Sequence, residues 1–308
     1  MTVMLDKQTE SYQSVFLEDE WAHQRYFGWK VVLDQPGLRV LRKRRAIFSR
    51  YLMLLTKGGE ASLTQAVRRA VSWGQLSDII VHDFSNLLPK EAELSGCKFS
   101  PARKAERLLN TSTFVVDLTL TKDELWHRFG DKSRNMVRKA EQLGAGFAPS
   151  VDANKELTDF YRFYTKIAVK YGVIPPKKKL LGRMLSDGDA TLLLSRDARG
   201  GIIAVSILYL AQDKAYNLYT ASAETAPTGL GQFLYWKTIE YLKNGGFRWY
   251  DLGGAGEKNE KGGIYVFKKS IGGAYVDLGE EYYYCSEFTS IAKDLASVAL
   301  TRRTRPAG

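Results

Sequence analysis

The residues best suited to chemistry lie late in the chain, in a glycine-rich stretch. Trp249-Tyr-Asp-Leu-Gly-Gly254 is followed by a loop and then by Gly262-Gly-Ile-Tyr-Val-Phe-Lys-Lys-Ser-Ile-Gly-Gly273. Glycines let the backbone approach a ligand closely. Phe267 offers an aromatic face for a base or a sugar, and Lys268 offers a fixed positive charge. On residue types alone, the stretch fits a ligand-binding site no better than it fits a purely structural segment made of a strand, a flexible loop and a surface helix with ordinary lysines.

Several kinds of catalytic machinery are missing from the sequence. Its three histidines, His23, His82 and His127, lie in neither a Gly-x-Ser-x-Gly nor a His-Glu-x-x-His motif, and we interpret them as structural residues. The two cysteines, Cys97 and Cys285, form no zinc-type cluster and cannot build a disulfide framework. The sequence contains no P-loop. Any chemistry is therefore expected to need no protein nucleophile and no metal.

Composition and charge favour a folded protein with a polyanionic partner. The 308 residues are 44% hydrophobic and 26% charged, which excludes a disordered chain, a collagen-like repeat and a small disulfide scaffold. The formal net charge of +11 predicts a nucleic acid, a phosphorylated metabolite or an anionic membrane as partner, although a basic protein need not bind a polyanion. The longest apolar run, residues 201–211, is about half the length of a membrane-spanning helix. Because the chain start also lacks a signal peptide's apolar core, we expect a cytoplasmic protein without membrane insertion.

Two stretches repeat the order strand, glycine turn, amphipathic helix and strand. The first has its strands at 46–55 and 78–82 and its helix at 62–73; the second has its strands at 214–220 and 247–251 and its helix at 232–244. The repeat predicts two copies of one α/β domain, which we place at residues 1–145 and 146–308. Between the copies, Thr121 and Glu124 form a capping box that opens a helix.

The segments 202–210 and 213–220 form a predicted antiparallel hairpin over Ala211-Gln212. Antiparallel strands that lead into a glycine turn and a helix fit a GNAT-type acyltransferase better than a Rossmann fold. The loop that binds coenzyme A in that fold usually reads Gln/Arg-x-x-Gly-x-Gly/Ala. Here Ala226-Pro-Thr-Gly-Leu-Gly231 keeps both glycines but lacks the leading Arg or Gln, which makes coenzyme A less favoured without excluding it.

Several short motifs follow one another along nearly the whole chain: Phe16-Leu-Glu-Asp-Glu-Trp21-Ala, Thr113-Phe-Val-Val-Asp-Leu118, Lys132-Ser-Arg-Asn-Met-Val-Arg-Lys-Ala140, Tyr219-Thr-Ala-Ser222, Asp251-Leu-Gly-Gly254 and Gly263-x-x-x-Phe-Lys268. Taken in this order, they resemble the Fem family of non-ribosomal peptidyltransferases, with Glu18 and Asp19 in place of the family's Gln-Ser. The family transfers an amino acid from aminoacyl-tRNA to a peptide amine. The resemblance implies an α/β (α+β) fold of two tandem GNAT-like domains, here without the coiled-coil arm of some members.

The resemblance also implies roles for individual residues. Lys268 would stabilise the negative charge that develops during transfer, and Phe267 would hold the 3′ end of the tRNA. Tyr219, Arg25 and Lys170 would contact the acceptor, although Arg25 and Lys170 replace a family lysine and a family arginine, and these two types are not equivalent at phosphates. No cofactor is implied beyond the aminoacyl-tRNA donor. The expected tRNA contacts are the basic residues Arg42, Lys43, Arg44, Arg45, Lys132, Arg134, Arg138 and Lys139.

Two other functions remain open at this stage. One is acyl-coenzyme A-dependent N-acylation, which is natural for a GNAT-like fold. The other is non-catalytic RNA binding through the basic segments, although no RNA-binding motif is present. Within the favoured function, the acceptor could be a peptidoglycan precursor or a peptide or peptidyl-nucleoside antibiotic, because the same transfer suits any well-placed amine.

Overall fold

The protein is described here from a computed structural model that covers residues 12–18, 25–45, 48–72, 77–103, 106–171, 174–224, 226, 228–255 and 263–286. Trp21, His23 and Pro227, together with the basic tail from residue 301, lie outside these ranges, and the side chain of Arg45 is not described. The described residues form two seven-stranded sheets with helices packed against them.

The chain divides into two compact units that are interleaved in sequence. Unit 1 contains residues 1–18 and 112–277, and unit 2 contains residues 19–111 and 278–308. The division therefore differs from the predicted consecutive domains 1–145 and 146–308, and the predicted boundary falls inside unit 1. The reason is long-range pairing: residues 112–117 pair with strands that follow much later, and residues 280–285 return to the other sheet. Local periodicity carries no information on such pairing.

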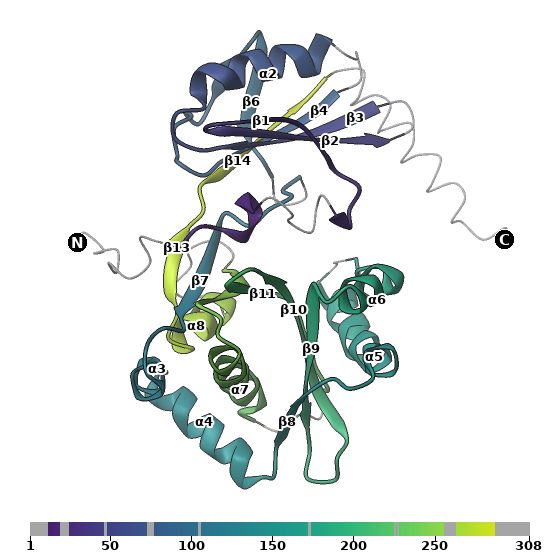
Figure 1. The fold of residues 1–308 in the computed structure, drawn as a ribbon, viewed down its shortest axis with the longest axis vertical. Coiled ribbons are helices and arrows are strands. Elements are labelled where there is room, and N and C mark those ends of the chain that lie inside the picture. The colour runs from purple at the N-terminus through teal and green to yellow at the C-terminus, as the bar shows by residue number, and fades with distance from the viewer. Residues whose placement is uncertain are drawn as a thin grey trace, which may run out of the picture. The chain divides into compact units, whose positions relative to one another are not determined.

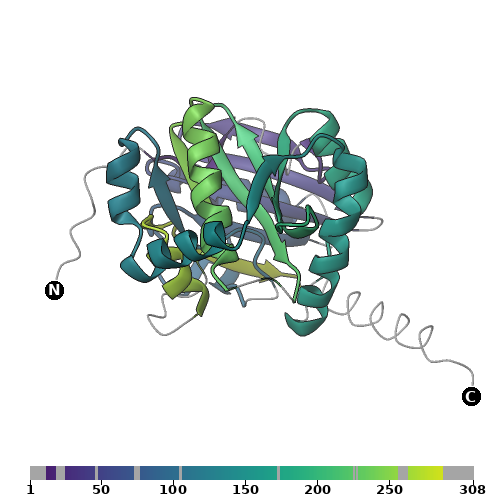
Figure 2. The same cartoon turned by 90° about the horizontal axis from the view of Figure 1, so that it is seen from below.

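Unit 1 is a sheet with helices on both faces (Figures 1 and 2). Its strand order is β13-β7-β12-β11-β10-β9-β8. One face is covered by α3, α4, α7 and α8 and the other by α5 and α6. The elements of unit 1 are the 3-10 helix η2 (Val15–Leu17), β7 (Ser112–Asp117), α3 (Lys122–Arg128), α4 (Asp131–Gln142), β8 (Gly146–Pro149), α5 (Ala153–Tyr171), α6 (Lys178–Ser186), β9 (Ala190–Arg196), β10 (Ile202–Ala211), β11 (Lys214–Ser222), α7 (Leu230–Asn244), β12 (Trp249–Gly254), α8 (Gly263–Ser270) and β13 (Ala274–Asp277).

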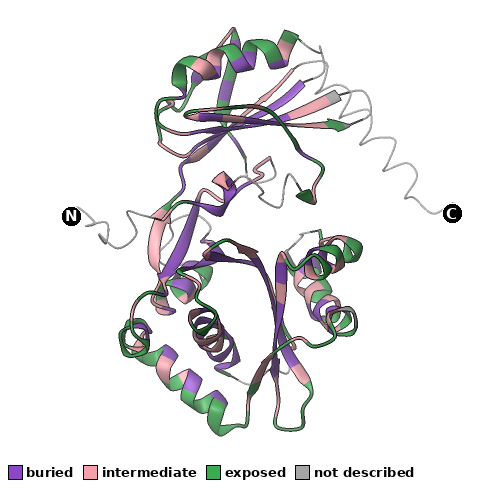
Figure 3. Cartoon of the chain, in the orientation of Figure 1, coloured by how far each residue is buried: buried purple, intermediate pink, exposed green. Residues whose placement is uncertain are grey.

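Unit 2 has a second sheet, with strand order β1-β2-β3-β4-β14-β6-β5, on which α2 packs. In both units the central strands are the most buried elements, whereas the edge strands β1 and β8 contain exposed residues and the outer helix faces are exposed (Figure 3). The elements of unit 2 are β1 (Lys30–Gln35), β2 (Leu38–Arg45), β3 (Phe48–Leu55), α2 (Glu60–Ser72), β4 (Ser77–Asp83), β5 (Ala92–Leu94), β6 (Cys97–Pro101) and β14 (Glu280–Cys285).

The local sequence signals correspond to observed structure. Both predicted strand-turn-helix-strand repeats are present, as β3-α2-β4 and as β11-α7-β12, each with parallel strands. The predicted hairpin is the antiparallel pair β10–β11. Thr121 and Glu124 form the predicted capping box at the start of α3, because each side chain bonds the backbone N–H of the other residue.

Candidate functional site

The parallel pairing of β11 with β12 stops early. The two strands pair at Lys214–Trp249, Ala215–Tyr250 and Tyr216–Asp251, and β12 also changes register against β7 after Asp251. Gly253, just beyond this point, has a φ of +76°, and a Cβ there would lie 2.7 Å from the carbonyl oxygen of Asn217. Only glycine fits this conformation and this contact without strain. The end of β12 is therefore a bent segment whose backbone groups are available to other partners.

Those backbone groups bind Lys268, which α8 presents to the end of β12. Lys268 Nζ donates to the carbonyl oxygens of Leu252 at 2.6 Å, Gly253 at 2.9 Å and Gly254 at 2.8 Å. An ammonium has three donors, so all of them are engaged in this arrangement. Lys268 is 8% exposed, and this burial lowers its pKa to about 8, while the charge of Asp251 opposes the shift. To bind a substrate oxyanion, Lys268 must exchange one carbonyl for that oxygen.

Phe267 lies beside the first turn of α7. Its ring packs edge-on against Tyr235, with 5.4 Å between centroids, and its nearest atoms would be 3.5 and 3.6 Å from a Cβ on Gly231. The residue before α7 is Gly229, which has a φ of +96° and gives no side-chain cap, and no acidic residue lies in the first turn. Backbone N–H groups at such a helix start attract phosphate and carboxylate groups. Phe267, one residue of the predicted pair, therefore lies next to a helix terminus suited to anions.

A buried polar cluster between β10, β11 and α7 was not predicted. The Asn217 amide donates to the Tyr235 hydroxyl at 2.9 Å, while its oxygen accepts from Ser206 at 3.0 Å and from Thr220 at 3.1 Å. Ser206 and Thr220 are directly paired across the hairpin. The sequence signal that could have identified them is the presence of polar residues in an otherwise apolar hairpin, because buried polar groups need partners.

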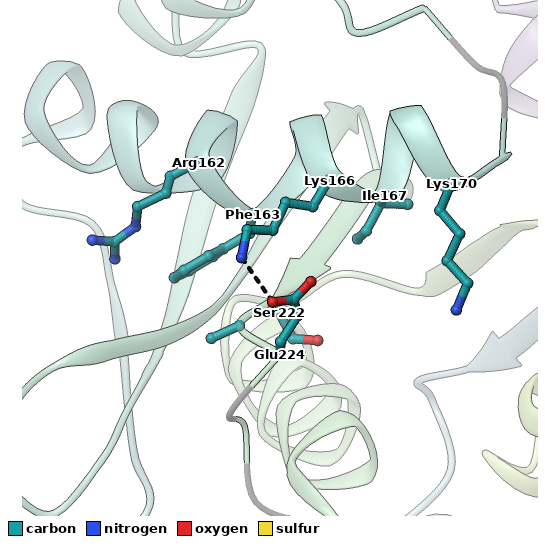
Figure 4. A pocket seen from close by; sticks show the side chains of 8 residues that line it. Arg162, Phe163, Lys166, Ile167, Lys170, Ser222 and Glu224 are labelled. Carbon is teal, nitrogen blue, oxygen red and sulfur yellow. Dashed lines mark hydrogen bonds and ion pairs between the residues drawn. The ribbon is translucent and has the colours of Figure 1, made fainter.

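Two of the three predicted acceptor residues lie on the α5 side of the unit 1 sheet. The Tyr219 ring packs edge-on against Tyr164, at 5.4 Å between centroids, and burial raises the pKa of Tyr219 to about 12. Lys170 lines a neighbouring pocket of about 460 Å³ between α5 and the end of β11 (Figure 4). The third residue, Arg25, is exposed and belongs to unit 2.

The pocket combines positive charge with an apolar floor. Three cations, Arg162, Lys166 and Lys170, follow one another at four-residue intervals along α5, and Phe163 and Ile167 lie between them. Figure 4 shows Lys166 reaching Glu224, with which it forms an ion pair of 2.7 Å. The complete lining is Arg162, Phe163, Lys166, Ile167, Lys170, Ser222, Ala223 and Glu224.

The eight predicted tRNA contacts are divided between the units. Lys132, Arg138 and Lys139 are exposed on α4. Arg134 instead folds back onto the end of α3, where it donates to the carbonyls of Trp126 at 3.3 Å and His127 at 3.0 Å, as well as to that of Phe129, and pairs with Asp131.

The remaining four, Arg42, Lys43, Arg44 and Arg45, are in β2 of unit 2. Because successive side chains of a strand point to opposite faces of the sheet, Lys43 does not share a face with Arg42 and Arg44. This run therefore does not form one continuous patch. Lys43 lies opposite Arg50 in the neighbouring strand β3, and Arg50 is paired with Asp78 at 2.6 Å.

Within the described ranges, no group of three or more His, Cys, Asp or Glu side chains could hold a metal ion. None of the helices described has the length and apolarity needed to cross a bilayer. The two described histidines have local partners: His82 contacts Glu281 at 3.2 Å and the Leu278 carbonyl at 2.7 Å, and His127 contacts the Asp123 carbonyl at 2.7 Å.

Comparison with known sequences identifies one domain. Residues 127–269 match the sequence model of the Acetyltransferase (GNAT) domain. This stretch runs from the end of α3 to the end of α8 and includes Lys268. Among curated proteins, no sequence matches the chain.

Solved structures resemble the chain over most of its length. The crystal structure of FemX has 16% sequence identity and a TM-score of 0.63, and the similarity covers 94% of this chain and 96% of FemX. The structure of L-PGS from Bacillus licheniformis has 13% identity and a TM-score of 0.53, covering 84% of this chain and 85% of L-PGS. A conserved protein of unknown function from Bacteroides thetaiotaomicron VPI-5482 has 14% identity and a TM-score of 0.54, with coverage of 84% and 85%. The predicted resemblance to the Fem family is thus confirmed at the level of the fold, and the chain has an α/β fold of two tandem GNAT-like domains.

Proposed function

We propose that the chain is a transferase that moves an aminoacyl group from tRNA to an amine of a peptide acceptor. The observation that carries this proposal is the Lys268 ammonium, held by three carbonyls where the β11–β12 pairing stops, beside Phe267 and the start of α7. The FemX-like fold supports the choice of donor. The reaction needs no cofactor besides the aminoacyl-tRNA, and this donor places it in the cytoplasm.

The proposed chemistry is aminolysis of an ester. The acceptor nitrogen attacks the carbonyl carbon that joins the amino acid to the terminal ribose of the tRNA. A C–N bond forms, the ester C–O bond breaks, and the ribose oxygen takes up the proton that the amine loses. Negative charge develops on the carbonyl oxygen, and the Lys268 ammonium stabilises it after releasing one backbone partner. One such donor typically contributes about 3–4 kcal/mol to the transition state.

The donor and the acceptor are assigned to different parts of unit 1. Phe267 and the start of α7 suit the stacked base and phosphate at the 3′ end of the tRNA, and the exposed cations Lys132, Arg138 and Lys139 suit its backbone. The cations of the α5 pocket suit an acceptor that carries an acidic or phosphate group near its peptide amine. A nucleotide-linked peptidoglycan precursor and an anionic peptide or peptidyl-nucleoside antibiotic both have this chemistry.

A transfer assay tests the proposal directly. The purified protein is incubated with tRNA charged with radiolabelled amino acids, and with either a UDP-linked wall peptide or a panel of free peptides. Label that moves to a peptide, and that is lost when the tRNA is digested beforehand, is the expected result. The amino acid that moves identifies the donor. Transfer to neither acceptor class, together with no binding of tRNA, would contradict the proposal.

An acyl-coenzyme A-dependent N-acyltransferase is the second candidate. It is favoured by the match to the GNAT acetyltransferase domain and by the start of α7, where Gly229 and Gly231 leave the helix terminus without a side-chain cap. The same assay separates the two functions when labelled acetyl-coenzyme A replaces the charged tRNA. Acetylation of the peptide amine without tRNA would support the second candidate.

A further inference from the structure

The backbone of Gly253 connects two buried, oppositely charged side chains. Its N–H donates to Asp251 Oδ1 at 2.8 Å, and its carbonyl accepts from Lys268 Nζ at 2.9 Å. The Thr113 hydroxyl lies 2.9 Å from the same carbonyl and also bonds Asp251 Oδ1. Gly253 has a left-handed backbone that only glycine adopts readily, and these contacts hold its N–H and its carbonyl in that conformation.

Asp251 is fully buried and is held from three segments of the chain. Besides Gly253 in β12 and Thr113 in β7, its Oδ2 accepts a 2.5 Å hydrogen bond from the Tyr12 hydroxyl. The Tyr12 ring packs edge-on against Trp249, at 5.7 Å between centroids, and the following residues of the segment, Val15 and Phe16, are buried. The N-terminal segment thus fixes the carboxylate, although it lies far from Asp251 in the sequence.

We propose that Asp251 is a positioning residue for Lys268: it orients the Gly253 backbone that binds the ammonium, and it places a buried negative charge beside that ammonium. The consequence for catalysis rests on the proposed function, whereas the positioning itself is a property of the free protein. The carboxylate contacts no substrate in this role. It acts only through Gly253 and through its charge.

The groups around Asp251 decide in which direction the protonation of Lys268 changes with pH. Besides Lys268 from α8, the groups that face Asp251 are Tyr12 from the N-terminal segment, Thr113 from β7 and Tyr250 from β12. Burial raises the pKa of both tyrosines well above 10, so they remain neutral. Burial lowers the pKa of Lys268 to about 8, and Asp251 raises it in opposition. Lys268 therefore loses its proton as the pH rises through about 8, and removal of the Asp251 charge moves this loss to lower pH.

The first experiment follows Lys268 itself and does not depend on substrate. Protein containing ¹³C-labelled lysine is titrated by NMR, with the Lys268 signal assigned by its absence from Lys268→Arg. In Asp251→Asn we expect the titration midpoint to fall by about one pH unit, as is typical when a close opposite charge is removed. Asp123→Asn, which removes an exposed carboxylate from α3 in the same unit, is the matched control and leaves the midpoint unchanged.

A second set of variants tests the same proposal in case Asp251→Asn does not fold. Thr113→Val removes the hydroxyl that links Asp251 to Gly253, and Thr113→Ser keeps it, so the valine variant shifts the midpoint and the serine variant restores it. In the transfer assay, the alkaline limb of the pH profile shifts in parallel, with kcat affected more than KM. Equal midpoints in the wild type, Asp251→Asn and Thr113→Val would overturn the proposal. A shifted midpoint in a protein whose wild type transfers no aminoacyl group would support the positioning role and contradict the proposed function instead.

Discussion

The two β-loop-α-β repeats have the same local pattern, but their strands pair to different extents. In unit 2, β3 and β4 pair in parallel at every residue from Ser49–Ser77 to Leu55–Asp83. In unit 1, the pairing of β11 with β12 stops after Tyr216–Asp251. Carbonyls at the end of β12 bind Lys268 instead. A completed ladder satisfies its own backbone groups, whereas an interrupted ladder offers them to a side chain or a ligand. Under the proposed function, we therefore expect the reaction to take place at the unit 1 repeat.

The first turns of the two repeat helices, α2 in unit 2 and α7 in unit 1, also differ in a way that favours anion binding only at α7. In unit 2, Glu60 lies in the first turn of α2, and a Cβ on the preceding Gly59 would lie 2.0 Å from the carbonyl oxygen of Gly37. A negative charge in the first turn opposes the binding of an anion there. In unit 1, the preceding Gly229 is also closely packed, because a Cβ on it would lie 2.4 Å from the carbonyl oxygen of Met136, but the first turn of α7 has no acidic residue. Gly231 in that turn is exposed, and a Cβ on it would meet only the ring of Phe267.

The largest effect is expected from removing the ammonium. Lys268→Ala should lower the rate of single-turnover transfer by about 10²–10³-fold, because it removes the donor for the developing negative charge. Binding of tRNA, measured by filter retention, should be retained. Lys269→Ala is the matched control, since Lys269 is exposed on the same helix. Unchanged transfer in Lys268→Ala would remove this residue from the mechanism.

The next effect concerns the bent end of β12. Gly253→Ala adds a Cβ 2.7 Å from the Asn217 carbonyl oxygen in a residue with a φ of +76°. Gly246 has a similar φ of +79° but open space around it, so Gly246→Ala tests backbone strain alone. We expect Gly246→Ala to lower the free energy of unfolding by about 1 kcal/mol and Gly253→Ala by about 2 kcal/mol more. Urea denaturation measures both, and equal losses would contradict the close approach of the two strands.

The local elements of the fold could be predicted from the sequence, but the division into units could not. The α7 helix follows from its apolar stripe and from glycines at its ends, and the β10–β11 hairpin follows from two apolar runs on either side of Ala211-Gln212. Nothing local indicates that β14 joins the sheet of unit 2, because strand pairing depends on the packing of distant segments. The boundary predicted at residue 145 therefore did not correspond to the observed units.

The candidate site was predictable only in part, for a related reason. Residue type and motif identified Lys268 and Phe267, and the structure places Phe267 beside the first turn of α7 and Lys268 against the end of β12. The motif also contained Asp251, but its partner Tyr12 is 239 positions away in sequence, so their contact could not be inferred. Similarly, Arg134 has the residue type of a tRNA contact, yet its three carbonyl partners at the end of α3 give it a structural role.

A smaller effect tests the difference between the helix starts. Gly231→Asp gives α7 an acidic first turn like that of α2, and we expect it to raise the KM for the donor about 5-fold, or ~1 kcal/mol. Gly231→Ala is the steric control, because its Cβ would lie at ordinary contact distance from Phe267. Glu60→Gln makes the converse change in unit 2 and should leave KM unchanged. Equal KM values for Gly231→Asp and Gly231→Ala would show that the donor phosphate lies elsewhere.

The smallest effect distinguishes the two basic segments as tRNA contacts. Replacing Lys132, Arg138 and Lys139 together by glutamine should reduce the salt dependence of tRNA binding by about 2 in the slope of log K against log salt, since each lost phosphate contact contributes roughly 0.7. The triple replacement of Arg42, Lys43 and Arg44 should reduce the slope less, because alternate residues of β2 point to opposite faces.

Arg134→Gln is the control for charge on α4. It removes one positive charge but also breaks the contacts with the carbonyls at the end of α3, so it should lower the free energy of unfolding by about 1–3 kcal/mol and leave the salt slope unchanged. A titration of tRNA binding at several salt concentrations, with urea denaturation of each variant, measures both quantities. If the β2 variant instead has the larger slope change, unit 2 supplies the main tRNA contacts. Unit 2, with its complete β3–β4 ladder, would then be a tRNA-binding domain, and unit 1 would carry out the transfer.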